Sequence, residues 1–409
     1  MPLATRTTTM RNPTALTDLP LELLWMISEY LSPVDLACLA LGNRHLLHSF
    51  AGTAFKSFSN CRTGNPTDDA RIKLLSRLSY DLPQYYLCFV CLRLHLWKKA
   101  RLPSHPIAHH RIDALDYTNW YLIQHLPLAH YPSYTLYKFH FMHLQLAMRR
   151  VYYGPQFGIP VESLLYTEIK ANRFRSKGPP LLQPHINKAS EGDTQKDFEF
   201  MTTIFSAEAR ICSTPPALCM RTQDIAVVTR QNVPRMWPCR ENGPMKVCKH
   251  IHTFDPAFSD ILASQIRRYY STTNPKVPAD QGSCDKCNTS WQLEIRTLDK
   301  THTSLTLTLW MDLGPGLSIE DPQWKYRLDN VPISFSAKHE IVDSRIRFER
   351  DSIQARSSNA LSEDEMYYRN VSLLEGKRYQ TVMTPVHGGI YILHGQAEAK
   401  TSPSRCIIL

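Results

Sequence analysis

Apolar residues near the start of the chain recur at three- and four-residue spacing, within residues 14–50. Leu23, Ile27 and Leu31 belong to this series, and such spacing places side chains on one face of a helix. Pro20 suits the first helical position, because the N–H that proline lacks would have no partner there. The pattern therefore predicts a helix with one apolar face that begins near Pro20.

A second helix is predicted shortly after the first, where Ser32 can cap it and Pro33 presets the backbone angle φ. Asp35 stands three residues after Ser32, as in a capping box. Gly42 is expected to end this helix, and a third short helix is expected from Asn43. Three short helices bury little surface by themselves, so this unit is expected to need a partner.

Residues 61–350 carry mixed signals of helices and strands. Helical periodicity covers residues 134–153 and a shorter stretch at 256–270. In THTSLTLTLWMDLG, residues 301–314, leucines alternate with threonines, and this alternation predicts a half-buried strand. The chain is therefore expected to be α+β, with a small three-helix domain over residues 14–60 followed by a mixed α+β domain.

The two ends of the chain look different from the middle. Residues 1–13 are polar and are expected to form a disordered leader. After residue 351, the segments ARSSNALSEDEMYY and HGQAEAKTSPSR offer little to bury, although GGIYIL has the composition of a strand. Residues 351–409 are therefore expected to be a mobile tail.

Composition and charge limit the classes of function. Apolar residues make up 43% of the 409 residues, which is typical of a globular protein. No secretory signal or apolar run long enough to span a bilayer is found, so the chain is expected in the reducing cytoplasm or nucleus. No glycine-rich phosphate loop, G-x-S-x-G or H-E-x-x-H motif occurs, and the chain is therefore expected not to be an enzyme.

The net charge of +10 suggests one alternative function, a zinc-stabilised protein that binds nucleic acid. The densest basic cluster is KANRFRSKG, within residues 170–178. The other bases are scattered and are not interleaved with aromatic residues, which a nucleic-acid-binding surface usually requires. Nucleic acid is therefore not the expected partner.

Cysteine pairs provide the clearest candidate chemistry. Two C-x-x-C pairs and one C-x-H pair have the spacing that lets two side chains bind one ion. In a reducing compartment, paired cysteines bind metal more often than they form disulfides. The preferred structural zinc set is Cys248, His250, Cys284 and Cys287. A weaker second set is Cys88, Cys91 and His95.

Two alternatives to these metal sets stay open. Cys88 and Cys91 have the same spacing as Cys284 and Cys287, so these four thiols could instead share one ion. The cysteines could also be reduced side chains that pack in the core. Zinc in either arrangement would hold a loop-rich domain together and would leave no open position for a catalytic water.

The N-terminal helical unit resembles the F-box. The residues that carry the resemblance are Leu19, Pro20, Glu22, Leu23, Ile27, Leu31, Asp35, Leu36 and Leu39. The third helix departs from the F-box pattern, because GNRHLLHSF lacks the usual cysteine–arginine run. The resemblance implies docking to the Skp adaptor of Skp–cullin–F-box ubiquitin ligases. The side chains implied for that surface are Leu19, Pro20, Leu23, Ile27, Leu31, Pro33 and Leu36.

The order of the later motifs is similar to that of fungal F-box proteins with a cysteine-containing C-terminal region. These motifs are C-x-x-C, YYGPQFGIP, C-x-H, C-x-x-C-x-T and WMDLGPGLSIEDPQW. The resemblance implies a non-catalytic substrate receptor that binds the Skp adaptor, and through it cullin, and recruits a protein substrate. A scaffold protein that acts outside the ligase would carry the same motifs.

The last four residues are Cys406, two isoleucines and a leucine, which fit the C-a-a-X prenylation motif. A final leucine favours a geranylgeranyl group, so a prenyltransferase is an expected partner. One lipid chain usually gives reversible binding, and firm anchoring takes a second signal. Weak peripheral membrane association is therefore expected.

Overall fold

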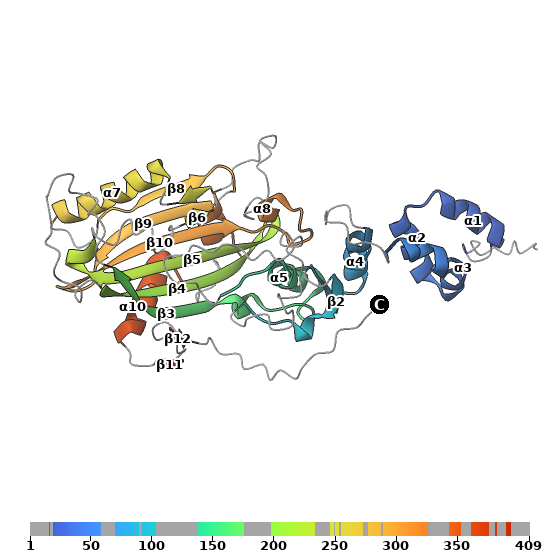
Figure 1. Ribbon diagram of the computed structural model, residues 1–409, viewed down its shortest axis with the longest axis horizontal. Helices are drawn as coiled ribbons and strands as arrows, with labels where there is room; N and C mark the ends of the chain where they lie inside the picture. The colour runs from blue at the N-terminus through green and yellow to red at the C-terminus, as the bar shows by residue number, and fades with distance from the viewer. Residues whose placement is uncertain are drawn as a thin grey trace, which may run out of the picture. The chain divides into compact units, whose positions relative to one another are not determined.

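The computed structural model of the chain contains two compact units, one up to His95 and one from Leu96 onward (Figure 1). The residues that it describes are 16, 19–58, 70–89, 92–103, 137–175, 198–233, 246–248, 250–252, 255–272, 277–287, 289–325, 327, 343–352, 361–375, 381–382 and 390–393. The predicted leader, Cys91 and the C-a-a-X residues lie outside these ranges.

The first unit is mainly helical. Its elements are α1 (Leu21–Glu29), α2 (Pro33–Gly42), α3 (Arg44–Ala54), the 3-10 helix η2 (Lys56–Phe58), α4 (Ala70–Asp81) and strand β1 (Tyr85–Cys88), which pairs with β2 (Arg93–Leu96). The three helices predicted within residues 14–50 are therefore present. A fourth helix, α4, also packs onto them, since Leu74 belongs to the same apolar core.

Local capping explains where α2 and α3 begin. The Ser32 hydroxyl accepts a hydrogen bond from the Asp35 backbone N–H at 3.2 Å. In the same way, the Asn43 side chain accepts one from the His45 N–H at 2.8 Å. Both caps satisfy backbone donors that an isolated helix leaves unpaired. The predicted starts of α2 and α3, and the end of α2 at Gly42, are confirmed.

The second unit is built on a large antiparallel sheet. Its long strands are β3 (Tyr166–Arg175), β4 (Phe198–Ser213), β5 (Pro216–Thr229), β9 (Thr289–Thr297) and β10 (His302–Asp312). Its short strands are β8 (Asp280–Cys284), β11 (Thr381–Val382) and β12 (Ile390–Leu393), with β6 (Lys246–Cys248) and β7 (Ile251–His252) forming a separate hairpin. The sheet order is β11-β12-β3-β4-β5-β10-β9-β8, which confirms the expected mixed α+β class.

Helices of the second unit lie around this sheet (Figure 1). They are η3 (Trp97–Lys99), α5 (Phe141–Tyr153), η6 (Val161–Leu164), η7 (Arg230–Asn232), α7 (Pro256–Ser271), α8 (Pro322–Lys325), α9 (Ser344–Ile346), the π-helical turn η9 (Arg347–Asp351) and α10 (Glu363–Glu375). The helices predicted over residues 134–153 and 256–270 correspond to α5 and α7.

Two helices cover opposite faces of the sheet. Phe258, Leu262 and Ile266 of α7 share an apolar core with the leucines of β10. On the other face, Tyr367 of α10 packs against Ile225 of β5, next to isoleucines of β3 and β4. The antiparallel register places Ile225 opposite Thr306, so the two cores lie on different sides of β10.

This arrangement corrects the expectation that residues 301–314 form a half-buried strand. The leucines of β10 lie on one buried face, which packs against α7, but Thr306 and Thr308 on the other face are also fully buried. Thr308 accepts a 3.4 Å hydrogen bond from the Gln223 side-chain amide of β5. The alternation of leucine and threonine therefore separates an apolar face from a polar face, and both faces are covered.

The segment that covers the polar face comes from the region expected to be a mobile tail, so that expectation is wrong for residues 361–375. Asn370 of α10 is fully buried, and its amide donates hydrogen bonds to Ser206 at 2.7 Å and Gln223 at 3.0 Å. The Tyr367 hydroxyl lies 2.6 Å from the Ser304 hydroxyl. The segment folds because the sheet supplies polar partners for its polar side chains.

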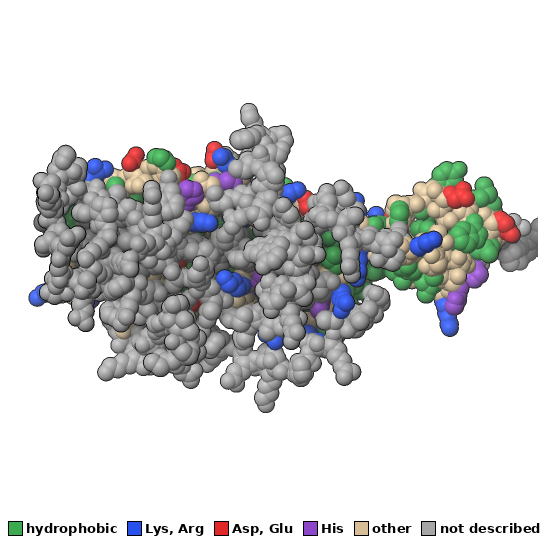
Figure 2. All heavy atoms as spheres, in the orientation of Figure 1, with side chains coloured by type: hydrophobic (Ala, Val, Ile, Leu, Met, Phe, Trp, Pro, Cys, Tyr) green, Lys and Arg blue, Asp and Glu red, His purple; other side chains and the backbone are tan. Residues whose placement is uncertain are grey.

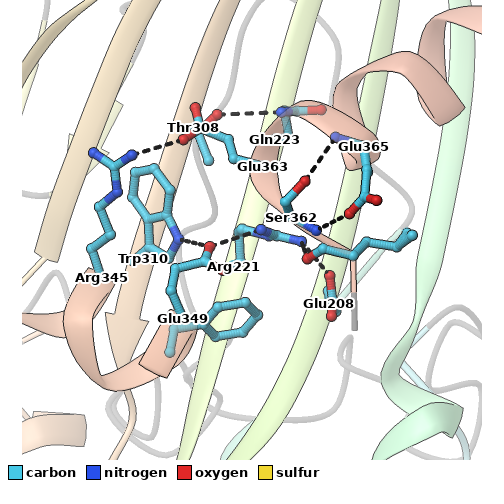
Figure 3. Close-up of polar contacts among 12 residues, drawn as sticks. Glu208, Arg221, Gln223, Thr308, Trp310, Arg345, Glu349, Ser362, Glu363 and Glu365 are labelled. Atoms are coloured by element: carbon cyan, nitrogen blue, oxygen red, sulfur yellow. Dashed lines mark hydrogen bonds and ion pairs between the residues drawn. The ribbon is translucent and has the colours of Figure 1, made fainter. Parts of the chain in front are cut away.

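Charged residues hold the preceding segment to the same face (Figure 3). Arg221 of β5 binds Glu208 of β4 at 2.7 Å and Glu349 of η9 at 2.8 Å. The Trp310 indole N–H also donates to Glu349, at 2.9 Å. Arg345 binds Glu363 at 3.1 Å, which joins α9 to the start of α10.

Candidate metal centre and docking helix

Two hairpin turns bring the preferred metal ligands together. Cys248 ends β6, and His250 lies in the turn that leads to β7. Cys284 ends β8, and Cys287 lies in the turn before β9. Val247 and Cys248 belong to the same apolar core as the cysteines of the β8–β9 turn. Core packing therefore positions one turn against the other.

The geometry of this cluster suits a metal ion. One ligand atom from each of Cys248, His250, Cys284 and Cys287 lies within 4.8 Å of all the others. The His250 Nδ1 atom is 3.8 Å from the Cys248 Sγ and 3.5 Å from the Cys284 Sγ. A tetrahedral zinc ion bound at about 2.3 Å would require ligand atoms about 3.8 Å apart. Three soft thiolates and one imidazole also match the ligands that zinc prefers.

Burial and charge within the cluster are uneven. All three cysteines are buried, whereas His250 is half-buried. The pKa of the Cys287 thiol lies well below its ordinary value, because Cys248 and Cys284 donate hydrogen bonds to its thiolate. The pKa of Cys248 is raised, because its hydrogen bonds to Cys284 and Cys287 and its burial favour the protonated thiol. Hydrogen bonds within the cluster thus shift the pKa values of these two thiols in opposite directions.

The alternative in which Cys88 and Cys91 share an ion with the β8–β9 turn is not tested, since Cys91 lies outside the described residues. The same holds for the second set of Cys88, Cys91 and His95. Cys88 is buried in β1, and the His95 ring stacks on Tyr86 with 5.6 Å between ring centres. Within the described part of the chain, Cys248, His250, Cys284 and Cys287 form the one group of three or more potential ligands.

Two residues beside this cluster were not predicted from the sequence. The Thr289 hydroxyl is 3.2 Å from the Cys287 sulfur, and Arg327 donates a hydrogen bond to that hydroxyl. Thr289 could have been found from its position in the C-x-x-C-x-T motif. Arg327 follows α8, and no spacing in the sequence relates it to a cysteine.

The second candidate site is the outer surface of α1. Large apolar residues that are exposed make up five of its nine positions: Leu21, Leu23, Trp25, Met26 and Ile27. Its buried positions are Leu24 and Ser28, four residues apart on one side of the helix. Figure 2 shows apolar side chains at the surface of the N-terminal helical unit, at the right of the view. An uncovered apolar surface of this kind marks a site of interaction.

The residues implied for docking differ in their exposure to solvent. Leu23 and Ile27 are 44% and 38% exposed, and Pro20 and Pro33 are also exposed. Leu19 and Leu31 are half-buried and pack at the edge of the helical core.

Leu36 does not belong to this surface. It is 7% exposed and lies within the apolar core of the helical unit. The reason is its place on α2, where Leu36, Ala37 and Ala40 form the side that faces the other helices. The structure therefore places Leu36 in the core of the helical unit, apart from the exposed residues implied for docking.

Comparison of the chain with protein-family models, with curated proteins and with solved structures found no match. The F-box resemblance thus stays a prediction. Among the described residues, no helix has the length and apolar character needed to cross a bilayer. Prenylation of Cys406 also stays a prediction, because the residue lies outside the described ranges.

Proposed function

We propose that this chain is the substrate receptor of a Skp–cullin–F-box ubiquitin ligase. The observation that carries the proposal is the exposed apolar surface of α1, on a small helical unit whose sequence resembles the F-box. An amphipathic helix with an uncovered apolar side is completed when a partner's groove receives it. The partner implied by the resemblance is the Skp adaptor.

The proposed mechanism is proximity. The receptor would bind a protein substrate through its second unit and the adaptor through its first. Holding a substrate lysine near the ubiquitin-conjugating enzyme raises the effective concentration of the two reactants without any chemistry by this chain.

We also propose that the cysteine–histidine cluster binds zinc as a structural ion. Cys248, Cys284 and Cys287 would supply thiolates, and His250 would supply the fourth ligand. The ion would join the β6–β7 hairpin to the β8–β9 turn and so stabilise one end of the sheet.

The docking proposal is tested by co-purification of the full chain with the Skp adaptor and cullin. In the double variant Leu23→Asp/Ile27→Asp, two unpaired carboxylates would be buried at the interface. We expect capture to fall at least about tenfold, since a penalty of about 1.4 kcal/mol suffices for that loss.

The matched control is Leu41→Asp. Leu41 is as exposed as Leu23 but lies on α2, outside the proposed surface. It should be captured like the wild type, and circular dichroism should show the same helix content in all three proteins. Failure of the wild type to capture the adaptor, or unchanged capture of the double variant, would refute the proposal.

A further inference from the structure

The buried hydroxyl group of Thr289, which is not one of the four candidate ligands, contacts the cysteine–histidine cluster. Thr289 is the first residue of β9 and is fully buried. Its Oγ1 atom lies 3.2 Å from the Sγ atom of Cys287. A sulfur bound to a metal is a thiolate and can only accept a hydrogen bond, so the hydroxyl must be the donor in that state.

A buried arginine orients this hydroxyl. Arg327 is 3% exposed, and its Nη1 group donates a hydrogen bond to the Thr289 oxygen. Because the oxygen accepts from Arg327, the one hydroxyl proton is free to point at Cys287.

Arg327 is itself held by two backbone carbonyl groups. Its Nε group donates to the Gln323 oxygen at 3.1 Å, and its Nη2 group donates to the Asp312 oxygen at 3.1 Å. These acceptors belong to α8 and to the end of β10. The rigid fork of the guanidinium group thus joins the DLGPG and DPQW segments to the metal cluster.

We infer that Thr289 and Arg327 are positioning residues for zinc, and this inference rests on the proposed zinc site. Zn²⁺ bound by three thiolates and a neutral imidazole leaves one net negative charge in a buried place. The positive charge of Arg327 balances that charge, and the Thr289 hydroxyl stabilises the Cys287 thiolate directly. Partners of this kind, which contact the ligands and not the ion, change metal affinity about 10- to 100-fold.

The test measures the zinc affinity of the full chain by competition with a chelator. Thr289→Val removes the hydroxyl and keeps the shape, so zinc should bind about 10- to 100-fold more weakly. Thr289→Ser restores the donor and should restore the affinity. Arg327→Gln removes the charge and should also weaken zinc binding. Thr306→Val is the matched control, because Thr306 is equally buried in the same sheet and its hydroxyl makes no hydrogen bond.

Cobalt substitution supplies a signal that a merely structural role would not change. The sulfur-to-cobalt charge-transfer band should shift in Thr289→Val, because one thiolate loses its hydrogen bond, and should return in Thr289→Ser. Wild-type affinity and an unshifted band in Thr289→Val would overturn the inference while leaving the zinc site intact. Absence of zinc binding by the wild type would overturn the zinc site itself, and the inference with it.

Discussion

Paired charges in the interior are the main feature of this molecule at the scale of single residues. Arg221 is fully buried between Glu208 and Glu349, and the adjacent Arg210 lies 2.9 Å from Glu208. Removing one partner from such a set leaves an uncompensated charge, which costs about 3–5 kcal/mol. These residues therefore fix where residues 343–352 lie on the sheet.

Glu363 gives a pH-dependent prediction at this scale. Burial raises the pKa of its carboxyl to about 7, although Arg345 opposes the shift. The folded state therefore keeps a proton that the unfolded chain releases at about pH 4.5. Stability contributed by this proton is present below pH 4.5 and is lost as the pH rises to about 7.

The variant Glu363→Gln should remove this dependence, because a neutral amide has no proton to lose. Relative to Glu363→Gln, we expect the wild type to lose up to about 3 kcal/mol of unfolding free energy between pH 5 and pH 8. Urea unfolding of both proteins at pH 5, 6, 7 and 8 measures the difference. A difference that stays constant with pH would show that Glu363 does not titrate in this range.

At the scale of elements, α10 acts as the cover of the polar face of the sheet. Its residues contact strands that are distant in sequence, as in the hydrogen bond between Asn370 and Ser206. Tyr367 fills the apolar part of this interface and is 1% exposed. The helix is thus part of the domain core, although its sequence is largely polar.

A pair of adjacent tyrosines tests this role. Tyr367→Ala should lower the unfolding free energy by about 3–5 kcal/mol, which is typical of removing a large buried aromatic side chain. Tyr368→Ala should cost less than about 1 kcal/mol, because Tyr368 is 63% exposed. Urea unfolding midpoints measure both. Equal effects of the two substitutions would mean that α10 is not packed as described.

The same elements show what the sequence could predict. The starts of α2 and α3 were predictable, since Ser32 and Asn43 cap these helices through residues two or three positions away. Folding of α10 was not predictable, because its polar side chains are satisfied by strands that lie far earlier in the sequence, from 63 residues for Tyr367 with Ser304 to 164 residues for Asn370 with Ser206. The cysteine pairs were visible as motifs, whereas the choice of partner for Cys284 depends on how two hairpins pack together.

At the scale of the whole molecule, the two compact units have separate apolar cores. Leu24 belongs to the core of the helical unit, and the three cysteines of the proposed zinc site belong to a core of the sheet unit. A ligand that binds only the folded state stabilises the unit that contains its site, by about 4 kcal/mol at a thousand times its dissociation constant. Zinc binding should therefore raise the stability of the sheet unit and leave the stability of the helical unit unchanged.

We accordingly expect two unfolding transitions when the full chain is heated. Chelation of zinc should lower the transition of the sheet unit by about 10 °C, given about 2–4 °C per kcal/mol for a unit of this size. The transition of the helical unit should not move, and capture of the Skp adaptor should survive chelation. Leu24→Ala removes a buried side chain from the helical core. It should therefore lower the transition of the helical unit and leave the transition of the sheet unit unchanged.

Differential scanning calorimetry of the wild type, with and without chelator, and of Leu24→Ala measures these shifts. A single transition that moves with both perturbations would show that the units unfold together, and zinc would then influence adaptor binding as well. Two independent transitions would mean that the proposed docking unit and the sheet unit with its proposed zinc site work as separate modules. Such separation is what the proposed function requires, because a receptor's docking unit must stay constant while its other unit is specialised for substrate.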